Sequence, residues 1–216
     1  MGKRGIQLIS DTFTHRIISA GTTIISNKIK FGIRAPKRKE LIYIDPNDIT
    51  GHLSPKIKKE LFYKTGLNCA AIVNGNWDLK TQNVDFKNKT VFESCYMHWV
   101  EGIPWRQTPT YKHYEQLLRK GEPNYFDSIK ELKSRYHKLD LIYYEVLKKR
   151  KMSTNIEDLV IINIRSDGSL IWGPDGRHRI CIAMIANLEF MPALIGYVHP
   201  NGLDKFQTLR KTNSGN

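Results

Sequence analysis

The chain of 216 residues carries 34 Lys and Arg against 21 Asp and Glu, which gives a formal net charge of +13. This length suits one domain, or one domain with a helical elaboration, and it is enough to bury a substantial core. No run approaches the roughly 18 apolar residues that a membrane span needs, so we expect no transmembrane segment and a cytoplasmic protein. So large an excess of cations favours an anionic partner, such as a nucleotide, nucleic acid or an anionic lipid surface.

The first 40 residues combine an apolar stripe with a basic end. Apolar residues recur at loosely helical spacing between residues 6 and 29, interrupted by Gly21 and two threonines, and a basic stretch with Gly32 and Pro36 follows. We predict that residues 1–40 form an N-terminal helical arm and an exposed basic connector. The arm is expected to dock on another surface.

Residues 41–200 contain the elements of a mixed α/β domain. Ser54 and Pro55 are typical of a helix start and Gly66 of a helix end, and an apolar face repeats at helical spacing through residues 126–150. We predict an α/β (α+β) fold with a small mixed sheet and a helical insertion at about 90–150. The expected segments are strands at 41–46, 69–73, 159–165, 169–173 and 190–198, helices at 54–66, 90–101, 109–121, 126–150 and 177–188, and a polar, frayed tail at 201–216.

The segment WGPDGRHRICIA, residues 172–183, places a turn with two glycines before two arginines at a predicted helix start. The first N–H groups of a helix lack intrahelical partners, and the helix dipole adds positive potential, so an anion binds favourably there. Gly173 and Gly176 would let the backbone approach a ligand closely. Arg177 and Arg179 would add bidentate donors, and His178 could donate or transfer a proton.

A structural role fits the same residues. Turns that contain Pro-Asp-Gly often precede helices, and arginines at helix starts are often only solvated. Asp175 would repel an anion unless it caps the helix, contacts a ribose hydroxyl or holds Mg²⁺. We take it as the candidate metal ligand and leave the other two roles open.

The stretch WGPDGRHRICIAMIANLEFMPALIGYVH resembles the C-terminal part of ParB/sulfiredoxin-like domains, in which a Gly-x-x-Arg motif lies between a strand and a helix. LIYIDPNDI resembles their opening strand, so the resemblance covers residues 41–74 and 156–199. It implies a sheet of the ParB/sulfiredoxin type and nucleotide chemistry with ATP, ADP or CTP and Mg²⁺. The sulfiredoxin cysteine is missing, so the resemblance does not extend to sulfinic acid reduction. The residues that it assigns to the phosphates are Gly176, Arg177, His178 and Arg179.

A second group of polar residues comes earlier in the chain. Asp78 ends the segment NGNWD after a predicted strand, where ligand-binding loops gather in α/β folds. His98 and Glu101 lie three residues apart on a predicted helix, a spacing that suits a base and its orienting group or two metal ligands. These three are candidate catalytic residues, although a surface His–Glu pair is far more common and no third metal ligand is evident.

Two functions follow from these expectations. One is a ParB-like DNA-binding protein or metal-dependent nuclease, for which the net charge is the main support. The other, which we favour, is a nucleotide-dependent phosphotransferase or NTP hydrolase. In that enzyme Arg177 and Arg179 would hold the phosphates. Asp175 or Asp78 would hold the Mg²⁺ ion, and Glu101 or His98 would activate the phosphate acceptor. A nucleotide-binding switch without turnover is a third possibility.

Overall fold

The central strand of the protein is β7 (Met191–Val198), all of whose residues are buried in the computed structural model, which describes residues 3–212. On one side β5 (Val160–Ile164) runs parallel to it. On the other side β1 (Leu41–Ile44) pairs antiparallel with the first half of β7 and β3 (Ala71–Ile72) pairs parallel with its end. A strand buried in this way reads as an unbroken apolar run, as FMPALIGYV does.

Three more strands complete a mixed sheet of seven strands in the described part of the chain. β6 (Leu170–Trp172) forms an antiparallel hairpin with β5, β2 (Ile49–His52) pairs parallel with β6, and β4 (Gln82–Asn83) closes the edge. The mixed α/β class predicted from the sequence is therefore confirmed. So is the C-terminal order of strand, turn, strand, helix and strand, because α6 (Arg177–Ile185) lies between β6 and β7.

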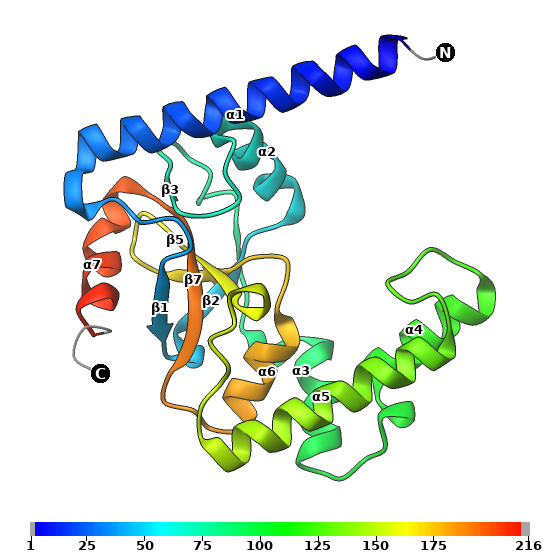
Figure 1. Ribbon diagram of the computed structural model, residues 1–216. Helices are drawn as coiled ribbons and strands as arrows, with labels where there is room; N and C mark the ends of the chain where they lie inside the picture. Colours follow the sequence, from blue (N-terminus) through cyan, green and yellow to red (C-terminus); the bar gives the residue numbers. More distant parts are fainter. Residues whose placement is uncertain (1–2, 213–216) are drawn as a thin grey trace.

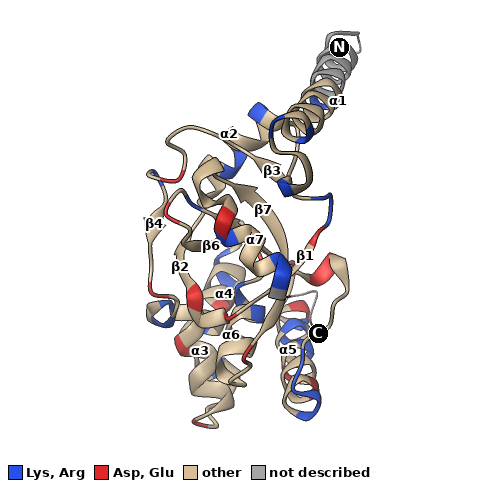
Figure 2. Cartoon of the chain, turned by 90° about the vertical axis from the view of Figure 1, so that its left-hand side faces the viewer, with Lys and Arg blue, Asp and Glu red and all other residues tan. Residues whose placement is uncertain are grey.

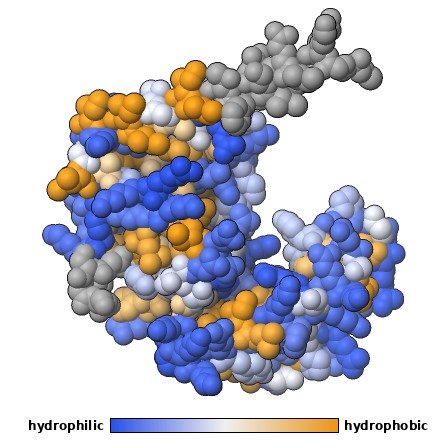
Figure 3. All heavy atoms as spheres, in the orientation of Figure 1, coloured by the Kyte–Doolittle hydropathy of each residue, from blue (hydrophilic) through white to orange (hydrophobic). Residues whose placement is uncertain are grey.

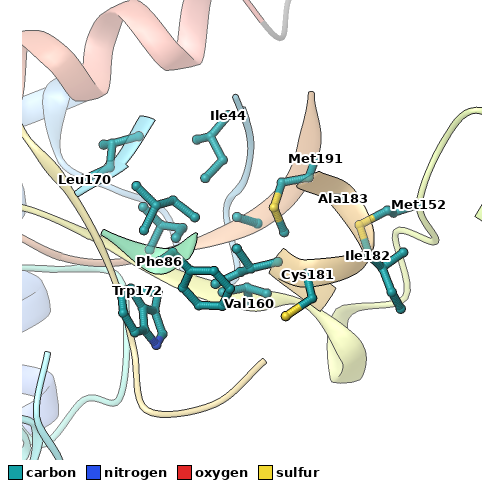
Figure 4. Packing of buried hydrophobic residues seen from close by; sticks show 14 of the residues in the cluster. Ile44, Phe86, Met152, Val160, Leu170, Trp172, Cys181, Ile182, Ala183 and Met191 are labelled. Atoms are coloured by element: carbon teal, nitrogen blue, oxygen red, sulfur yellow. The ribbon is translucent and has the colours of Figure 1, made fainter. Parts of the chain in front are cut away.

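A buried amide fixes the backbone in the middle of this sheet. Asn163 on β5 accepts a hydrogen bond from Tyr197 N at 2.8 Å, where the pairing of β5 with β7 is irregular. A Cβ atom on Gly196 would lie 2.2 Å from the Asn163 Oδ1 atom, so only glycine fits there. Figure 4 shows Val160, Cys181 and Met191, from β5, α6 and β7, meeting in the core next to this sheet.

Helices gather at two ends of the sheet (Figure 1). At one end α1 (Lys3–Phe31) crosses over α2 (Pro55–Thr65), whose ends are the predicted Ser54 cap and Gly66 in the left-handed conformation. At the other end α6 packs against a helical layer formed by α3 (Thr90–Trp99), α4 (Pro109–Lys120) and α5 (Ile129–Lys149). This layer shows that residues 90–150 are mainly helical, as predicted. No helix among residues 3–212 is long and apolar enough to cross a membrane.

The predicted frayed tail is wrong for residues 203–212. These residues form α7 (Leu203–Thr212), which packs against β1 and β5. Leu203, Phe206 and Leu209 are spaced by three residues on one face of the helix and are all buried. Arg210 adds an ion pair to Glu40, with an Nε–Oε1 distance of 2.6 Å. The polar composition of the segment hid this apolar stripe.

Candidate phosphate-binding cavity

The loop between β6 and α6 is held in place by its backbone. Gly173 N continues the sheet pairing by donating to Ile161 O at 2.8 Å. Gly176 has a φ of +87°, and a Cβ atom there would lie 2.7 Å from the Val160 side chain. Glycine is thus required at position 176 by its conformation and by its packing. Among residues 3–212 no side chain caps α6, so the N–H groups of Arg177 and His178 are available to a ligand, whereas that of Arg179 donates to Gly176 O.

This loop forms one wall of a cavity of about 510 Å³, and α5 forms the facing wall. Lys and Arg residues recur along α5 (Figure 2). The cavity is lined by four cationic side chains, three acidic ones and three aromatic ones, besides His178. They are Arg135, Lys138, Arg177 and Arg179; Glu131, Asp158 and Asp175; and Tyr114, Tyr125 and Phe126.

Two of these acids are already paired with cations. Arg179 contacts Asp158 at 3.0 Å and is mostly buried, and the exposed Asp175 contacts Lys58 outside the cavity at 3.4 Å. Among the described residues no carboxylate pairs with the other three cations, Arg135, Lys138 and Arg177. The cavity therefore has a surplus of positive charge, as an anion site needs.

His178 adds a neutral polar group to the wall. Its Nε2 atom is buried and has no hydrogen-bond partner among the described residues, and its ring meets that of Tyr136 edge to face, with centroids 6.1 Å apart. Burial, with smaller contributions from Arg135 and Arg177, lowers the pKa of His178 to about 4. At neutral pH the imidazole is uncharged, so it can donate one hydrogen bond and accept another.

The predicted catalytic pair is not assembled at this cavity. His98 lies on α3, where its Nδ1 atom is 2.7 Å from Ile103 O and its Nε2 atom is 3.2 Å from Asp140 Oδ1. Asp140 also accepts hydrogen bonds from the indoles of Trp99 and Trp105, both at 2.9 Å. His98 thus belongs to a half-buried aromatic cluster that connects α3 to α5. Glu101 lies beyond the last residue of α3 and is exposed, so it does not share a helix face with His98.

Asp78 lies at the opposite end of β5 from the loop. Its carboxylate accepts hydrogen bonds from Ser166 N at 3.0 Å and from Ser166 Oγ at 2.5 Å, just after β5 ends. Burial acts to raise the pKa of Asp78, but these bonds and the nearby His199 outweigh burial and lower it. The loop joins β5 at Ile161, three residues before the strand ends at Ile164, so about 10 Å of strand lies between them at about 3.3 Å per residue. Asp78 therefore stabilises the turn between β5 and β6 through its hydrogen bonds with Ser166.

The described residues contain no group of three or more His, Cys, Asp or Glu side chains that could hold a metal ion. The three acids that line the cavity do not form such a group: Asp175 pairs with Lys58, Asp158 pairs with Arg179, and Glu131 lies on α5.

The role of the cations on α5 was not predicted from the sequence. Arg135 and Lys138 lie beside the buried stripe of that helix, and Glu131, Arg135, Lys138 and Ile142 repeat at spacings of four, three and four. The signal that could have found them is this second stripe, which borders the core face and so faces whatever α5 packs against.

No family model, curated protein or solved structure matches the chain.

Proposed function

We propose that the cavity between α5 and the loop at 173–176 binds the phosphates of a nucleotide, and that the chain is a nucleotide-dependent phosphotransferase or NTP hydrolase. The observation that carries this proposal is the convergence of an uncapped helix N-terminus with three cations that have no described ion-pair partner. A phosphate held there would meet backbone donors, the helix dipole and guanidinium groups together. The order of β6, α6 and β7 supports the ParB/sulfiredoxin type as part of the same proposal.

The aromatic wall of the cavity suits the base or the sugar. Phe126 and Tyr125 each lie edge to face with Tyr114, with centroids 5.1 and 6.2 Å away, and Tyr125 is strongly exposed. A planar base could stack on these rings while the phosphates lie at the cationic end. Phosphoryl transfer needs mainly positioning and neutralisation of charge, which this combination supplies.

The acids of the cavity take the catalytic roles in this proposal. Asp175 is the solvent-exposed acid of the loop, and exchange of its contact with Lys58 for a nucleotide-bound Mg²⁺ would bring the metal to the phosphates. Glu131 lines the facing wall and is the candidate to orient the phosphate acceptor. His98, Glu101 and Asp78 have no part in it because they do not line the cavity.

Isothermal titration with ATP, ADP and CTP, each with Mg²⁺, tests the binding. Arg177→Ala and Arg135→Ala should each weaken affinity by roughly 10- to 100-fold, the usual cost of a charge-assisted hydrogen bond. Arg119→Ala is the matched control, because Arg119 is an exposed arginine of α4 whose ion pair is with Glu115 of the same helix and which does not line the cavity. If none of the nucleotides binds, or if both cavity variants bind like the control, the proposal fails.

Turnover is tested separately, by phosphate release and by transfer of labelled phosphate from the nucleotide that binds. We expect turnover that depends on Mg²⁺ and is lost in Asp175→Asn. Tight binding with no turnover would overturn the enzymatic part and leave a nucleotide-binding switch.

A second candidate, binding of nucleic acid with or without metal-dependent cleavage, is favoured by one observation. A cavity of about 620 Å³ lies next to the first one along α5 and shares Asp158 and Arg179 with it. It is also lined by Lys151 and by Lys149, which pairs with Glu145 of the same lining. A backbone with several phosphates could follow the cations of the two cavities. Gel shifts with duplex and single-stranded oligonucleotides at about 0.15 M salt test this, and Lys149→Ala/Lys151→Ala should weaken binding. Cleavage with added divalent metal would favour a nuclease.

A further inference from the structure

Helix α1 carries three of its isoleucines on the face away from the domain. Arg16, Ala20 and Asn27, spaced by four and seven residues, lie on the inner face. Ile18, Ile25 and Ile29, spaced by seven and four, lie on the outer one. Two residues, or roughly 200° of rotation, separate Arg16 from Ile18 and Asn27 from Ile29. The inner face also holds Phe31, which packs against the core, so the helix has an apolar side toward the domain and a second group of isoleucines that faces outward.

The inner face is packed closely enough to fix the orientation of the helix. A Cβ atom on Gly66 would lie 2.5 Å from both Ala20 N and Arg16 O, so the backbones of α1 and the end of α2 are in direct contact. The Arg16 guanidinium lies 5.0 Å from the ring centre of Phe62. Rotation of α1 to bury its isoleucines would break this contact, since only a glycine allows it.

The outer face is a large apolar surface. Ile18, Ile25 and Ile29 are 63%, 61% and 78% exposed, and Ile17, Ile24 and Ile33 are also exposed. Figure 3 shows this apolar surface over the described part of α1, with hydrophilic residues beside it. Exposed apolar residues scattered singly are ordinary, but several exposed isoleucines on one helix are typical of an interaction surface.

Exposed cations lie near the C-terminal end of α1. Lys28, Lys37 and Arg38 line a hollow of about 920 Å³ between this end of the helix and the domain, together with Asn27 of the inner face and Leu67. In the described part of the chain no carboxylate pairs with these three cations. Residues 16–40 hold seven Lys and Arg and a single acid, Glu40, which Arg210 already engages.

We propose that α1 and the basic connector form a docking surface for an anionic lipid membrane. The isoleucines would enter the boundary between headgroups and acyl chains, with the helix lying in the plane of the interface. Lys28, Lys37 and Arg38 would contact the anionic headgroups. A second copy of the chain is the poorer occupant, because pairing two such faces would bring the same unpaired cations together.

Sedimentation with vesicles tests the proposal. The protein should bind vesicles of phosphatidylcholine with about 30 mol % phosphatidylserine much more tightly than phosphatidylcholine alone, and salt should weaken the binding. Ile18→Ser/Ile25→Ser/Ile29→Ser should lower the partition coefficient on the order of 100-fold. The control is Leu79→Ser/Leu141→Ser, which removes two exposed leucines outside α1 and should bind like the unaltered protein.

The electrostatic part has its own variant. Lys28→Gln/Lys37→Gln/Arg38→Gln should lose the preference for anionic vesicles while its thermal unfolding temperature stays unchanged. Light scattering without lipid provides the opposing outcome. If the unaltered protein is a dimer and the triple isoleucine variant is a monomer, the apolar face binds a second copy of the chain and the proposal is overturned. Failure to bind either kind of vesicle, or binding that the isoleucine and leucine variants retain equally, would overturn it as well.

Discussion

The buried His178 makes the stability of the protein sensitive to mild acid. Its pKa lies at about 4 in the folded protein and at 6.5 when exposed, because burial and the cations Arg135 and Arg177 oppose protonation. Between these two values the unfolded chain binds a proton that the folded chain does not, so the free energy of unfolding falls as the pH falls. The loss is small at pH 7, reaches about 2 kcal/mol at pH 5, and levels off at about 3 kcal/mol below pH 4.

Urea unfolding at pH 7, 6 and 5 of the protein and of His178→Gln isolates this effect. Every other titrating group is present in both proteins, so the difference between their free energies of unfolding follows His178 alone. We expect that difference to change by about 2 kcal/mol from pH 7 to pH 5, with the unaltered protein losing more. If His178→Gln does not fold, proton NMR of the histidine rings reads the pKa directly.

A constant difference across this pH range, or a His178 resonance that titrates near 6.5, would refute the reasoning. The same measurement bears on the proposed ligand. An anion bound in the cavity would stabilise the protonated ring, so saturating nucleotide should raise the pKa of His178. By linkage, nucleotide affinity should increase as the pH falls toward 5.

Two further changes probe the frame around the cavity. Asp140→Ala leaves the indoles of Trp99 and Trp105 without their shared acceptor, so it should lower the free energy of unfolding by about 2–4 kcal/mol and alter tryptophan fluorescence, as urea titration would show. Gly176→Ala combines a strained φ with a contact to Val160 at 2.7 Å, so it should cost about 1–3 kcal/mol in the same titration and displace α6. Unchanged stability in either variant would contradict the packing described above.

Local chemistry was enough to predict many of the elements. Ser54 accepts a hydrogen bond from Ile57 N, and Gly66 and Gly121 end their helices in the left-handed conformation, as their residue types indicated. The hairpin at 166–168 and the helix after Gly176 follow from the same rules. Each of these signals acts within a few residues, so it can be recognised in the chain without knowledge of the fold.

The partners of the candidate site were not predictable in this way. Arg135 reaches the loop at 173–176 only because α5 packs beside α6, a contact between residues some 40 positions apart. His98 drew notice through its spacing from Glu101, but its actual partner is Asp140 on another helix. Spacing along the sequence says which residues share a helix face, whereas a site depends on which faces meet.

The two walls of the cavity come from different parts of the chain, and this has a consequence for binding. The strand-loop-helix unit supplies the N–H groups and Arg177, while the helical layer supplies Arg135 and Lys138. Without an anion between the walls, the positive charges of Arg135, Lys138 and Arg177 repel one another. The Arg179–Asp158 ion pair beside them supplies a negative charge that reduces this repulsion. An anion between the walls would replace that repulsion with attraction to both, so it should tighten the packing of α5 against α6 as well as bind. Ligand binding and the stability of the helical layer are therefore expected to rise together, which neither wall could produce alone.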